Sequence, residues 1–297
     1  MSLNKLVSIV GTTASGKSSL GIELAEHYGA EIISADSRQV FCHLDLGTGK
    51  VTEEEMARVK HHLIDVVDLN GSFSMAEFQS MAYGVIDEIS SRGVLPIMVG
   101  GTGLYTRSVV EGYNLADVPP DPALRGELEA KDDGEIDRML RSYGRIVDDP
   151  AVSRRRRIRM LEKLIGGAEA EQESTPRYDV LQLGITFPRD VLNKRILERL
   201  DMRINDGMID EVRHVMELGA TPEFLERLGL EYRYTYRYIS GQYPSYEAYH
   251  EELYREICRF AKRQMTWFRK EKNIIWLDSE GDMLSESIKL VDDFLNK

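Results

Sequence analysis

The sequence is poor in the features that mark several classes of protein. Its 297 residues include two cysteines, Cys42 and Cys258, which are too few for a disulfide framework or a cysteine-based zinc site and indicate a reducing compartment. No run approaches the roughly 18 consecutive apolar residues that a membrane-spanning helix needs. The first residues lead directly into a strand pattern, without a signal peptide. We therefore expect a cytoplasmic protein with no membrane partner.

A surplus of positive charge is also missing. The chain carries 38 lysines and arginines against 50 aspartates and glutamates, a net charge of −12. This balance argues against a nonspecific coat for nucleic acid, although it leaves room for a local basic surface that grips one particular RNA. With 42% hydrophobic residues, the chain has enough apolar side chains to bury a core.

Short apolar runs alternate with helical segments along most of the chain. This alternation predicts a parallel α/β sheet with right-handed crossovers. The expected strands are residues 6–10, 31–34, 94–99, 180–185 and 273–277. The expected helices include one that Gly29 closes, then 74–91, 189–218 and 245–269, followed by a terminal helix. The helix at 245–269 has an apolar stripe expected to face the core, made of Tyr246, Tyr249, Leu253, Ile257, Phe260 and Trp267.

One region departs from this alternation. Residues 115–178 contain no convincing strand and are rich in charged, helix-forming residues, which predicts a helical insert. We accordingly divide the chain into a first core part (1–114), the insert (115–178) and a return to the core with C-terminal helices (179–297). The predicted fold class is α/β: a P-loop NTPase-like parallel sheet with flanking helices and an all-helical insert.

A phosphate-binding motif lies between the first strand and the first helix. The segment fits G-x-x-x-x-G-K-[ST] and consists of Gly11, Thr12, Thr13, Ala14, Ser15, Gly16, Lys17 and Ser18. Backbone amides of such a loop curl round a phosphate chain, and the helix N-terminus adds positive potential. Lys17 would neutralise the terminal phosphates and Ser18 would bind the Mg²⁺ that bridges them. The motif predicts a polyphosphate site without saying which polyphosphate.

The acidic residue at a strand end is Asp36. NTPases usually place an aspartate after a second core strand, but the strand at 94–99 ends in Gly100, Gly101 and Thr102. Because strand ends on this side of an open α/β sheet face the ligand crevice, Asp36 lies at the expected site. From spacing alone it can be a metal ligand, a general base or a helix N-cap.

Two basic segments stand out in this acidic chain. Five of the six residues at 154–159 are arginines, and residues 262–269 combine basic residues, an amide and aromatics. The arginine run is either a solvated helix face or a surface that contacts an RNA backbone. The aromatics of the second segment are either core residues or platforms on which RNA bases stack. His61 and His62 would point to opposite faces of a strand, which argues against a shared metal.

Together these segments resemble the tRNA dimethylallyltransferases, also called tRNA isopentenyltransferases. Six segments match in the family's order and spacing: 11–18, 36–41, 45–50, 61–68, 100–105 and 262–269. The resemblance implies transfer of a dimethylallyl group from dimethylallyl diphosphate to N6 of an adenine adjacent to the anticodon in tRNA. It implies a bacterial type of enzyme, since two cysteines cannot form the zinc-finger extension of eukaryotic relatives.

The resemblance also assigns roles. Asp36 would be the general base, with Thr102, Lys17 and Thr13 at the reacting centre and Mg²⁺ at Ser18. Contacts with the anticodon stem-loop would come from Asp36, Ser37, Arg38, Gln39, Thr102, Arg125, Arg155, Arg156, Arg157, Ile158, Arg159, Arg233, Lys262 and Arg263. We expect a monomer.

The chain departs from the family at three places. The insert is shorter before its arginine helix, Val51 replaces a common proline, and residues 229–233 alter the usual pattern around Arg233. Three alternatives remain open. One is a related enzyme that prenylates free AMP, ADP or ATP, another is a P-loop kinase of small metabolites, and the last is a noncatalytic RNA-binding module. An RNA-binding arm favours tRNA over a free nucleotide.

Overall fold

The computed structural model describes residues 3–115, 118, 121–149, 152–167 and 174–297, and these form two compact units. The first combines Met1–Glu111 with Pro176–Lys297, and the second is Gly112–Thr175. Within the described residues, no helix combines the length and hydropathy that crossing a bilayer requires.

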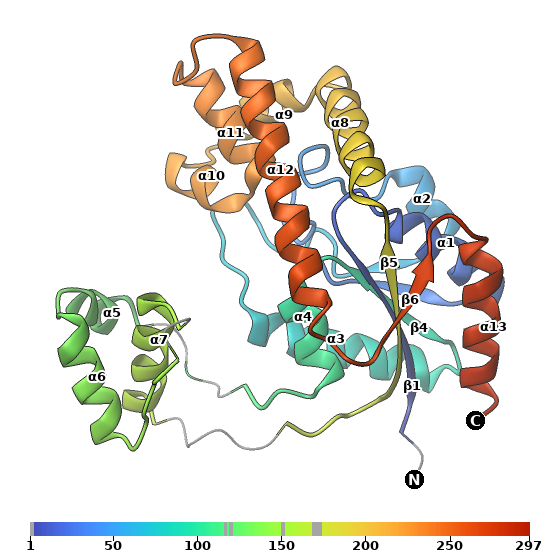
Figure 1. Cartoon of the computed structure of the whole chain (residues 1–297), viewed down its shortest axis with the longest axis horizontal. Coiled ribbons are helices and arrows are strands. Elements are labelled where there is room, and N and C mark those ends of the chain that lie inside the picture. Colours follow the sequence, from blue (N-terminus) through green and yellow to red (C-terminus); the bar gives the residue numbers. More distant parts are fainter. Residues whose placement is uncertain (1–2, 116–117, 119–120, 150–151, 168–173) are drawn as a thin grey trace. The chain divides into compact units, whose positions relative to one another are not determined.

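A six-stranded parallel sheet forms the centre of the first unit (Figure 1). Its order is β3-β2-β4-β1-β5-β6, and each neighbouring pair is parallel. The strands are β1 (Lys5–Gly11), β2 (Glu31–Ser34), β3 (His61–His62), β4 (Pro96–Gly100), β5 (Asp179–Thr186) and β6 (Ile274–Asp278). Side chains of β1 from Leu6 onward are buried, as expected for a central strand with both faces covered. The predicted fold class is confirmed.

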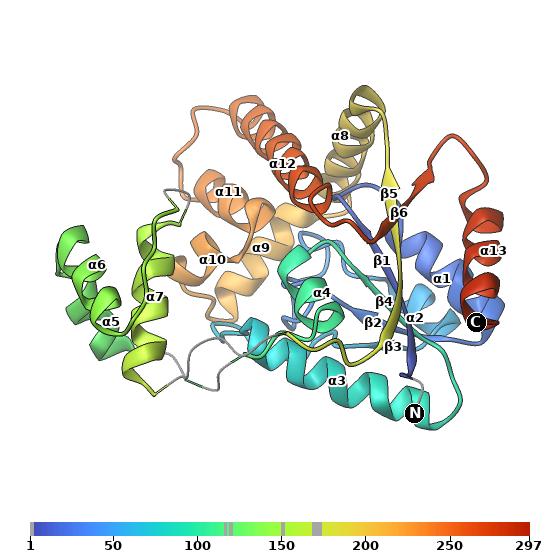
Figure 2. The same cartoon turned by 60° about the horizontal axis from the view of Figure 1, so that its bottom comes forward.

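Helices cover both faces of this sheet. Apolar residues of α1 (Lys17–Tyr28) and α13 (Met283–Leu295) form one core cluster with the strands, and α3 (Met75–Ser91) and α4 (Gly103–Val110) form another (Figure 2). Gly29 ends α1 at φ 59°, as predicted. The remaining helices of this unit are α2 (Glu53–Arg58), α8 (Arg189–Asn205), α9 (Met208–Glu217), α10 (Pro222–Leu228), α11 (Leu230–Ile239) and α12 (Tyr246–Phe268).

Two sequence predictions for the helices are corrected. The single helix expected over 189–218 is two helices, α8 and α9, because Gly207 between them has φ 105°, which a continuing right-handed helix cannot accommodate. In α12, the expected core stripe is only partly buried. Tyr249, Leu253 and Ile257 are in the core, whereas Tyr246 and Phe260 are each 39% exposed.

The second unit contains three helices in its described residues and no strand. They are α5 (Pro122–Glu129), α6 (Asp133–Ser142) and α7 (Arg154–Ile165). Asp121, Asp132 and Ser153 cap their N-termini with side-chain hydrogen bonds. A small apolar core joins the helices and consists of Leu128, Ile136, Leu140, Ile158 and Leu161.

Candidate active site

The phosphate-binding motif is the turn between β1 and α1. Ala14 (φ 61°) and Gly16 (φ 82°) both have left-handed backbone, which for an alanine is uncommon and marks a loop held by its surroundings. A side chain at Gly11 would lie 2.6 Å from the Ser15 hydroxyl, so glycine lets Ser15 pack closely against the start of the turn. The first amides of α1 have no partner within the helix, and an anion can accept their hydrogen bonds.

The ends of β2 and β4 bring Asp36 and Thr102 together. A side chain at Gly100 would collide with the carbonyl of Ala35, so glycine permits the close approach of the two strand ends. The Thr102 Oγ1 then accepts a hydrogen bond from the Ser37 amide at 3.0 Å. Asp36 Oδ1 accepts one from the Arg38 amide at 2.9 Å, within a turn rather than a helix, so the helix N-cap alternative for Asp36 does not apply.

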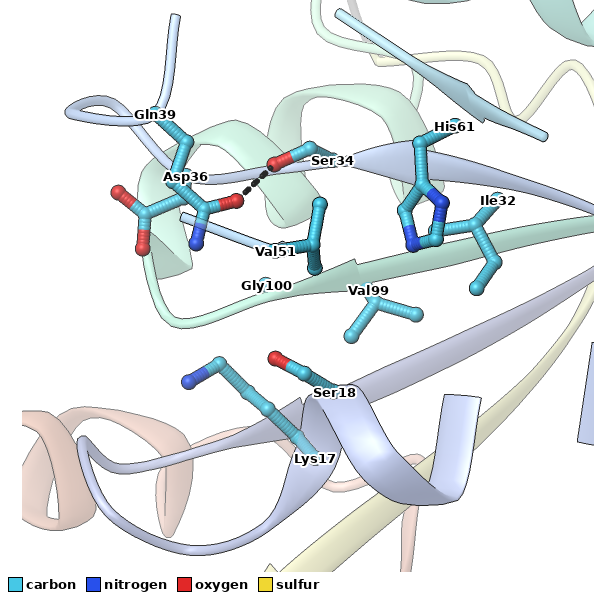
Figure 3. Close-up of a pocket in the computed structure, with 10 residues that line it drawn as sticks. All are labelled: Lys17, Ser18, Ile32, Ser34, Asp36, Gln39, Val51, His61, Val99 and Gly100. Carbon is cyan, nitrogen blue, oxygen red and sulfur yellow. Dashed lines mark hydrogen bonds between the residues drawn. The ribbon is translucent and has the colours of Figure 1, made fainter. Parts of the chain in front are cut away.

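The motif and these strand ends face one another across a cavity (Figure 3). Lys17 and Ser18 lie on one side, and Asp36 and Gln39 lie on the other. Apolar side chains and His61 extend the lining away from Asp36. The lining residues are Lys17, Ser18, Ile32, Ser34, Asp36, Gln39, Val51, His61, Val99 and Gly100.

Lys17 is half-buried and lies among charges of both signs. Burial lowers the pKa of its ammonium to about 8, and Arg199 and Arg203 add to this lowering, while Asp36 opposes it. A multiply charged anion would stabilise the charged form of the lysine. The electrostatics of this side of the cavity therefore favour a phosphate ligand.

Three arginines of α8 reinforce this positive side and were missed in the sequence analysis. Arg195 Nε donates to the carbonyl of Ala14 at 2.9 Å, and the Arg199 guanidinium donates to the Thr13 hydroxyl. Burial lowers the pKa of Arg199 to about 9, with a further contribution from Arg203. Their spacing of four residues, which places them on one helix face, is the signal that would have identified them.

Gln264 of α12 was also missed, although its segment was recognised. Its side-chain oxygen accepts from the Thr13 amide at 2.9 Å, and its Nε2 donates to the carbonyl of Gly101 at 3.0 Å. One amide thus joins the phosphate-binding loop to the turn that carries Thr102. Lys262 and Arg263, expected to contact tRNA, are exposed on the same helix.

The other residues of this unit that are expected to contact tRNA differ in how firmly hydrogen bonds within the protein hold their side chains. Burial lowers the pKa of Arg38, which lies near Asp36. Gln39 is 9% exposed, with its side chain bonded to Ser34 at 3.0 Å and to the Gly49 carbonyl at 2.9 Å. Arg233 Nε donates to the carbonyl of Glu226 at 2.5 Å. Of these side chains, Gln39 is the one most firmly held within the fold.

The candidate tRNA contacts in the second unit divide in a similar way. Three of them, Arg125, Arg157 and Arg159, form ion pairs within the unit, at 2.6–3.0 Å. The Ile158 side chain is 3% exposed and packs in the core of the unit. Arg155 and Arg156 are exposed and have no partner among the described residues, so their charges are available.

The residues present suit Mg²⁺. The hydroxyl of Ser18 and the carboxylate of Asp36 line one cavity, and oxygen is the ligand that Mg²⁺ prefers. Within the described chain, no three His, Cys, Asp or Glu side chains converge into a metal cluster. This arrangement fits an ion held mainly by a hydroxyl, water and the oxygens of a bound phosphate.

Comparisons with known proteins agree on one family. The model for "IPP transferase" matches residues 39–271. A protein of Treponema denticola, "tRNA dimethylallyltransferase 2", is 41% identical over 281 residues, which cover 90% of this chain and 92% of that protein. The structure of a tRNA isopentenylpyrophosphate transferase from Bacillus halodurans matches with 37% identity and a TM-score of 0.74, covering 99% of this chain and 96% of that one. A eukaryotic dimethylallyltransferase acting on tRNA shares the fold, with a TM-score of 0.81 at 23% identity over 99% of this chain and 80% of that one.

Proposed function

The chain belongs to the IPP transferase family and modifies tRNA as a dimethylallyltransferase, and we propose how its residues carry out that reaction. The donor is dimethylallyl diphosphate, and the acceptor is the exocyclic N6 of an adenine adjacent to the anticodon. The observation that carries the proposal is one cavity with Lys17 on one side and Asp36 on the other. Two substrates of different chemistry can therefore meet there.

The positive side of the cavity binds the leaving group. Diphosphate carries several negative charges, and its negative charge grows as the bond to the dimethylallyl carbon breaks. Amides of the phosphate-binding loop, Lys17 and Arg199 are fixed donors for that charge. Mg²⁺ at Ser18 would neutralise diphosphate oxygens when bound.

The opposite side activates the acceptor. The N6 lone pair of adenine is delocalised into its ring, so the amine is a weak nucleophile. As the new bond forms between N6 and the dimethylallyl carbon, the electron pair of the old carbon–oxygen bond leaves with diphosphate. The Asp36 carboxylate takes the N6 proton. Thr102 accepts a hydrogen bond from the amide of Ser37 at 3.0 Å and so holds the turn that directly follows Asp36.

The acceptor is tRNA rather than a free nucleotide. The names and high coverage of the curated relatives support this choice, as do the exposed Arg155 and Arg156 in a helical unit that the nucleotide reaction would not need. An adenine in an anticodon arm must leave its stack to reach an enclosed site. The reaction takes place in the cytoplasm, with the protein acting as a monomer.

The test is a paired reaction of purified protein with Mg²⁺ and dimethylallyl diphosphate. One arm contains unmodified tRNA and the other contains AMP and ATP, and nucleosides are identified by mass spectrometry after digestion. We expect prenyl-adenosine in the tRNA arm. Product only in the nucleotide arm would make the protein a free-nucleotide prenyltransferase, and phosphate transfer from ATP without prenylation would make it a kinase.

Asp36→Asn tests the general base within the same assay. This variant should bind tRNA normally and lose turnover by about 10²-fold or more, the scale of general acid–base catalysis. Glu26→Gln, which changes an exposed carboxylate paired with Arg58, is the matched control. Turnover of Asp36→Asn at the wild-type rate would show that another group takes the proton.

A further inference from the structure

One carboxylate outside the cavity receives four hydrogen bonds. Glu211 of α9 accepts from the amides of Asp45 (3.0 Å) and Leu46 (2.7 Å) through Oε2. Its Oε1 accepts from the amide of Gly47 (3.0 Å) and from the Tyr232 hydroxyl (2.5 Å). Two oxygens with about four lone-pair sites are thereby fully used.

Glu211 and its four donors form a clamp, in which the carboxylate holds the backbone of residues 45–47 in the segment 45–49. Three successive backbone amides that point at one carboxylate form a nest of the kind that binds anions, and here the anion belongs to the protein itself. Tyr232 is 2% exposed, and a side chain at Gly47 would lie 2.6 Å from its ring. Glycine at 47 therefore lets the segment lie directly on the tyrosine that completes the clamp.

The clamped segment leads to two residues at the cavity. Gly49 has φ 62°, and a side chain there would collide with the Arg203 guanidinium. The Gly49 carbonyl accepts from Gln39 Nε2 at 2.9 Å, and Gln39 Oε1 accepts from the Ser34 hydroxyl at 3.0 Å. Both Gln39 and Ser34 line the cavity that contains Asp36. The position of Gly49 thus sets where Gln39 lies, three residues along the chain from Asp36.

A second anchor holds the same segment independently of Glu211. Lys50 Nζ donates to the carbonyl of Phe41 at 3.1 Å, pairs with Asp45 at 2.5 Å and also pairs with Asp65. Removal of the Glu211 carboxylate should therefore loosen residues 45–47 while Lys50 keeps the segment attached to the fold. Because the Gly49 amide donates to the Leu46 carbonyl at 3.1 Å, Gly49 should shift with them, without loss of the fold.

We infer that Glu211 is a positioning residue for prenyl transfer, which acts through the segment 45–49 to set Gln39 at the cavity and Arg203 beside Gly49. The inference rests on the proposed function for the reaction itself. It does not make Glu211 a catalytic residue, because its carboxylate is fully occupied by protein donors. Displacement of a positioning contact by about 1 Å can cost about 10²-fold in rate.

The experiment compares Glu211→Ala, Glu211→Gln and Tyr232→Phe in the full chain. We expect Glu211→Ala to lower kcat/KM for tRNA prenylation by about 10- to 100-fold, mostly through kcat. Tyr232→Phe leaves three of the four hydrogen bonds and should cost less than about fivefold. Glu211→Gln should fall between the two, because its single oxygen can replace only part of the acceptor set.

Val291→Ala is the matched control for general destabilisation. Val291 of α13 is 1% exposed and lies in the core cluster that α1 and α13 form with the strands. This cluster includes none of the residues of the clamp. We expect it to lower Tm while leaving kcat/KM near the wild-type value. Equal losses of kcat/KM in Glu211→Ala and Val291→Ala at equal loss of Tm would overturn the positioning role.

Two further measurements separate this inference from the proposed function. Hydrogen exchange at the amides of 45–47 should be slow in the wild type and faster in Glu211→Ala, and unchanged exchange would overturn the clamp. Binding of inorganic diphosphate with Mg²⁺ should weaken by a few-fold in Glu211→Ala through Arg203. A wild-type protein with protected amides but no prenyl transfer would refute the proposed function, whereas an active wild type with a fully active Glu211→Ala would refute only the positioning role.

Discussion

Two groups of arginines in this chain look alike in composition and differ in surroundings. Arg195 and Arg199 of α8 donate hydrogen bonds to the phosphate-binding loop. Arg203 follows on the same helix and lies 3.5 Å from Glu231. In α7, by contrast, Arg157 pairs with Asp137 at 2.9 Å and Arg159 pairs with Glu162 at 2.9 Å. Cations without matching acids mark a site for an external anion, whereas matched cations hold the protein together.

The pKa values express the same difference. In α8, burial and the neighbouring Arg203 lower the pKa of Arg199 to about 9. In α7, the hydrogen bond with Asp137 raises the pKa of Arg157. A charged group that burial destabilises is stabilised when a ligand of opposite charge binds beside it. A group that already has an ionic partner does not gain this stabilisation. Arg199 of α8 is therefore the arginine whose electrostatics favour an incoming anion.

The strongest test of this comparison removes one arginine from each group. Arg199→Ala takes away a fixed cation where charge develops on the leaving group, and kcat/KM for dimethylallyl diphosphate should fall by about 10²-fold or more. Arg157→Ala removes the same charge from the second unit, and KM for the donor should stay within about twofold of wild type. Steady-state kinetics at saturating tRNA measure both.

Inorganic diphosphate provides an independent readout for the same pair. As a product it should inhibit the wild type and the Arg157→Ala variant similarly, and it should inhibit Arg199→Ala much less. If both variants lost affinity for diphosphate to the same extent, the contrast between unmatched and matched arginines would have no functional meaning.

A second prediction concerns the two arginines of α7 that escape the pairing rule. Arg155 and Arg156 are exposed and unpaired within the described residues, so they remain available for a phosphate backbone. The double variant Arg155→Ala/Arg156→Ala should weaken tRNA binding and reduce the slope of log affinity against log salt by about 1.5. Filter binding between low and moderate salt gives this slope.

Arg157→Ala is again the control, since its partners Asp133 and Asp137 already neutralise it. Its salt slope should match the wild type. A double variant with an unchanged slope would assign Arg155 and Arg156 to a solvated face of the helix.

Local patterns in the sequence predicted the elements that depend on neighbouring residues. The phosphate-binding motif, its flanking strand and helix, and the strand end at Asp36 all follow from short-range spacing. The place of Asp36 at the crevice followed from a rule of topology, because strand ends on this side of an open α/β sheet face the ligand. Thr102 was selected by the family resemblance alone. These predictions needed no knowledge of side-chain packing.

Convergence of distant segments was beyond such patterns. Arg199 reaches Thr13 from 186 residues away, and Gln264 reaches it from 251 residues away. Conversely, the arginine run at 154–159 was conspicuous by composition, yet its pairing with Asp133 and Asp137 depends on how α6 and α7 pack. Composition reveals how many charges a segment has, and only the fold shows which of them are neutralised.

The third prediction tests whether matched pairs stabilise the second unit. The Glu162 side chain is fully buried. It accepts hydrogen bonds from Arg125 at 2.6 Å and from the Asp121 amide at 2.6 Å, and it forms an ion pair with Arg159 at 2.9 Å. Burial alone would raise its pKa, but these hydrogen bonds outweigh burial and lower it. Glu162→Gln should cost about 2–3 kcal/mol in free energy of unfolding, because charged partners lose their acceptor.

Hydrogen exchange along α7 in the full chain measures this loss locally. Glu127→Gln, an exposed carboxylate of the same unit, is the control and should change exchange little. Unchanged protection of α7 in Glu162→Gln would mean that its apolar core, rather than its ion pairs, holds the unit together.

The smallest expected effect concerns a network of paired charges in the first unit. It tests whether paired charges there act as they do in the second unit. Glu31 accepts hydrogen bonds from Arg92 at 2.7 and 2.8 Å, and its carboxylate lies 2.7 Å from His62. The hydrogen bond with Arg92 is the main cause that lowers the pKa of Glu31 to about 2, whereas burial acts in the opposite direction. Since the folded pKa lies below the unfolded value near 4.5, the stabilisation is complete above pH 4.5 and is lost as the pH falls towards 2.

Glu31→Gln should therefore flatten the acid limb of stability between about pH 4.5 and pH 2 and cost about 1–2 kcal/mol at neutral pH, after allowance for the solvent around Arg92. Prenyl transfer at neutral pH should remain near wild type, because Glu31 does not line the cavity. Urea unfolding at several pH values measures the first effect and the tRNA assay the second. A large loss of prenyl transfer with little change in acid stability would mean that a paired carboxylate network serves function directly. The rule drawn from α7 and α8, that paired charges stabilise the fold and unpaired cations mark a ligand site, would then fail in the sheet.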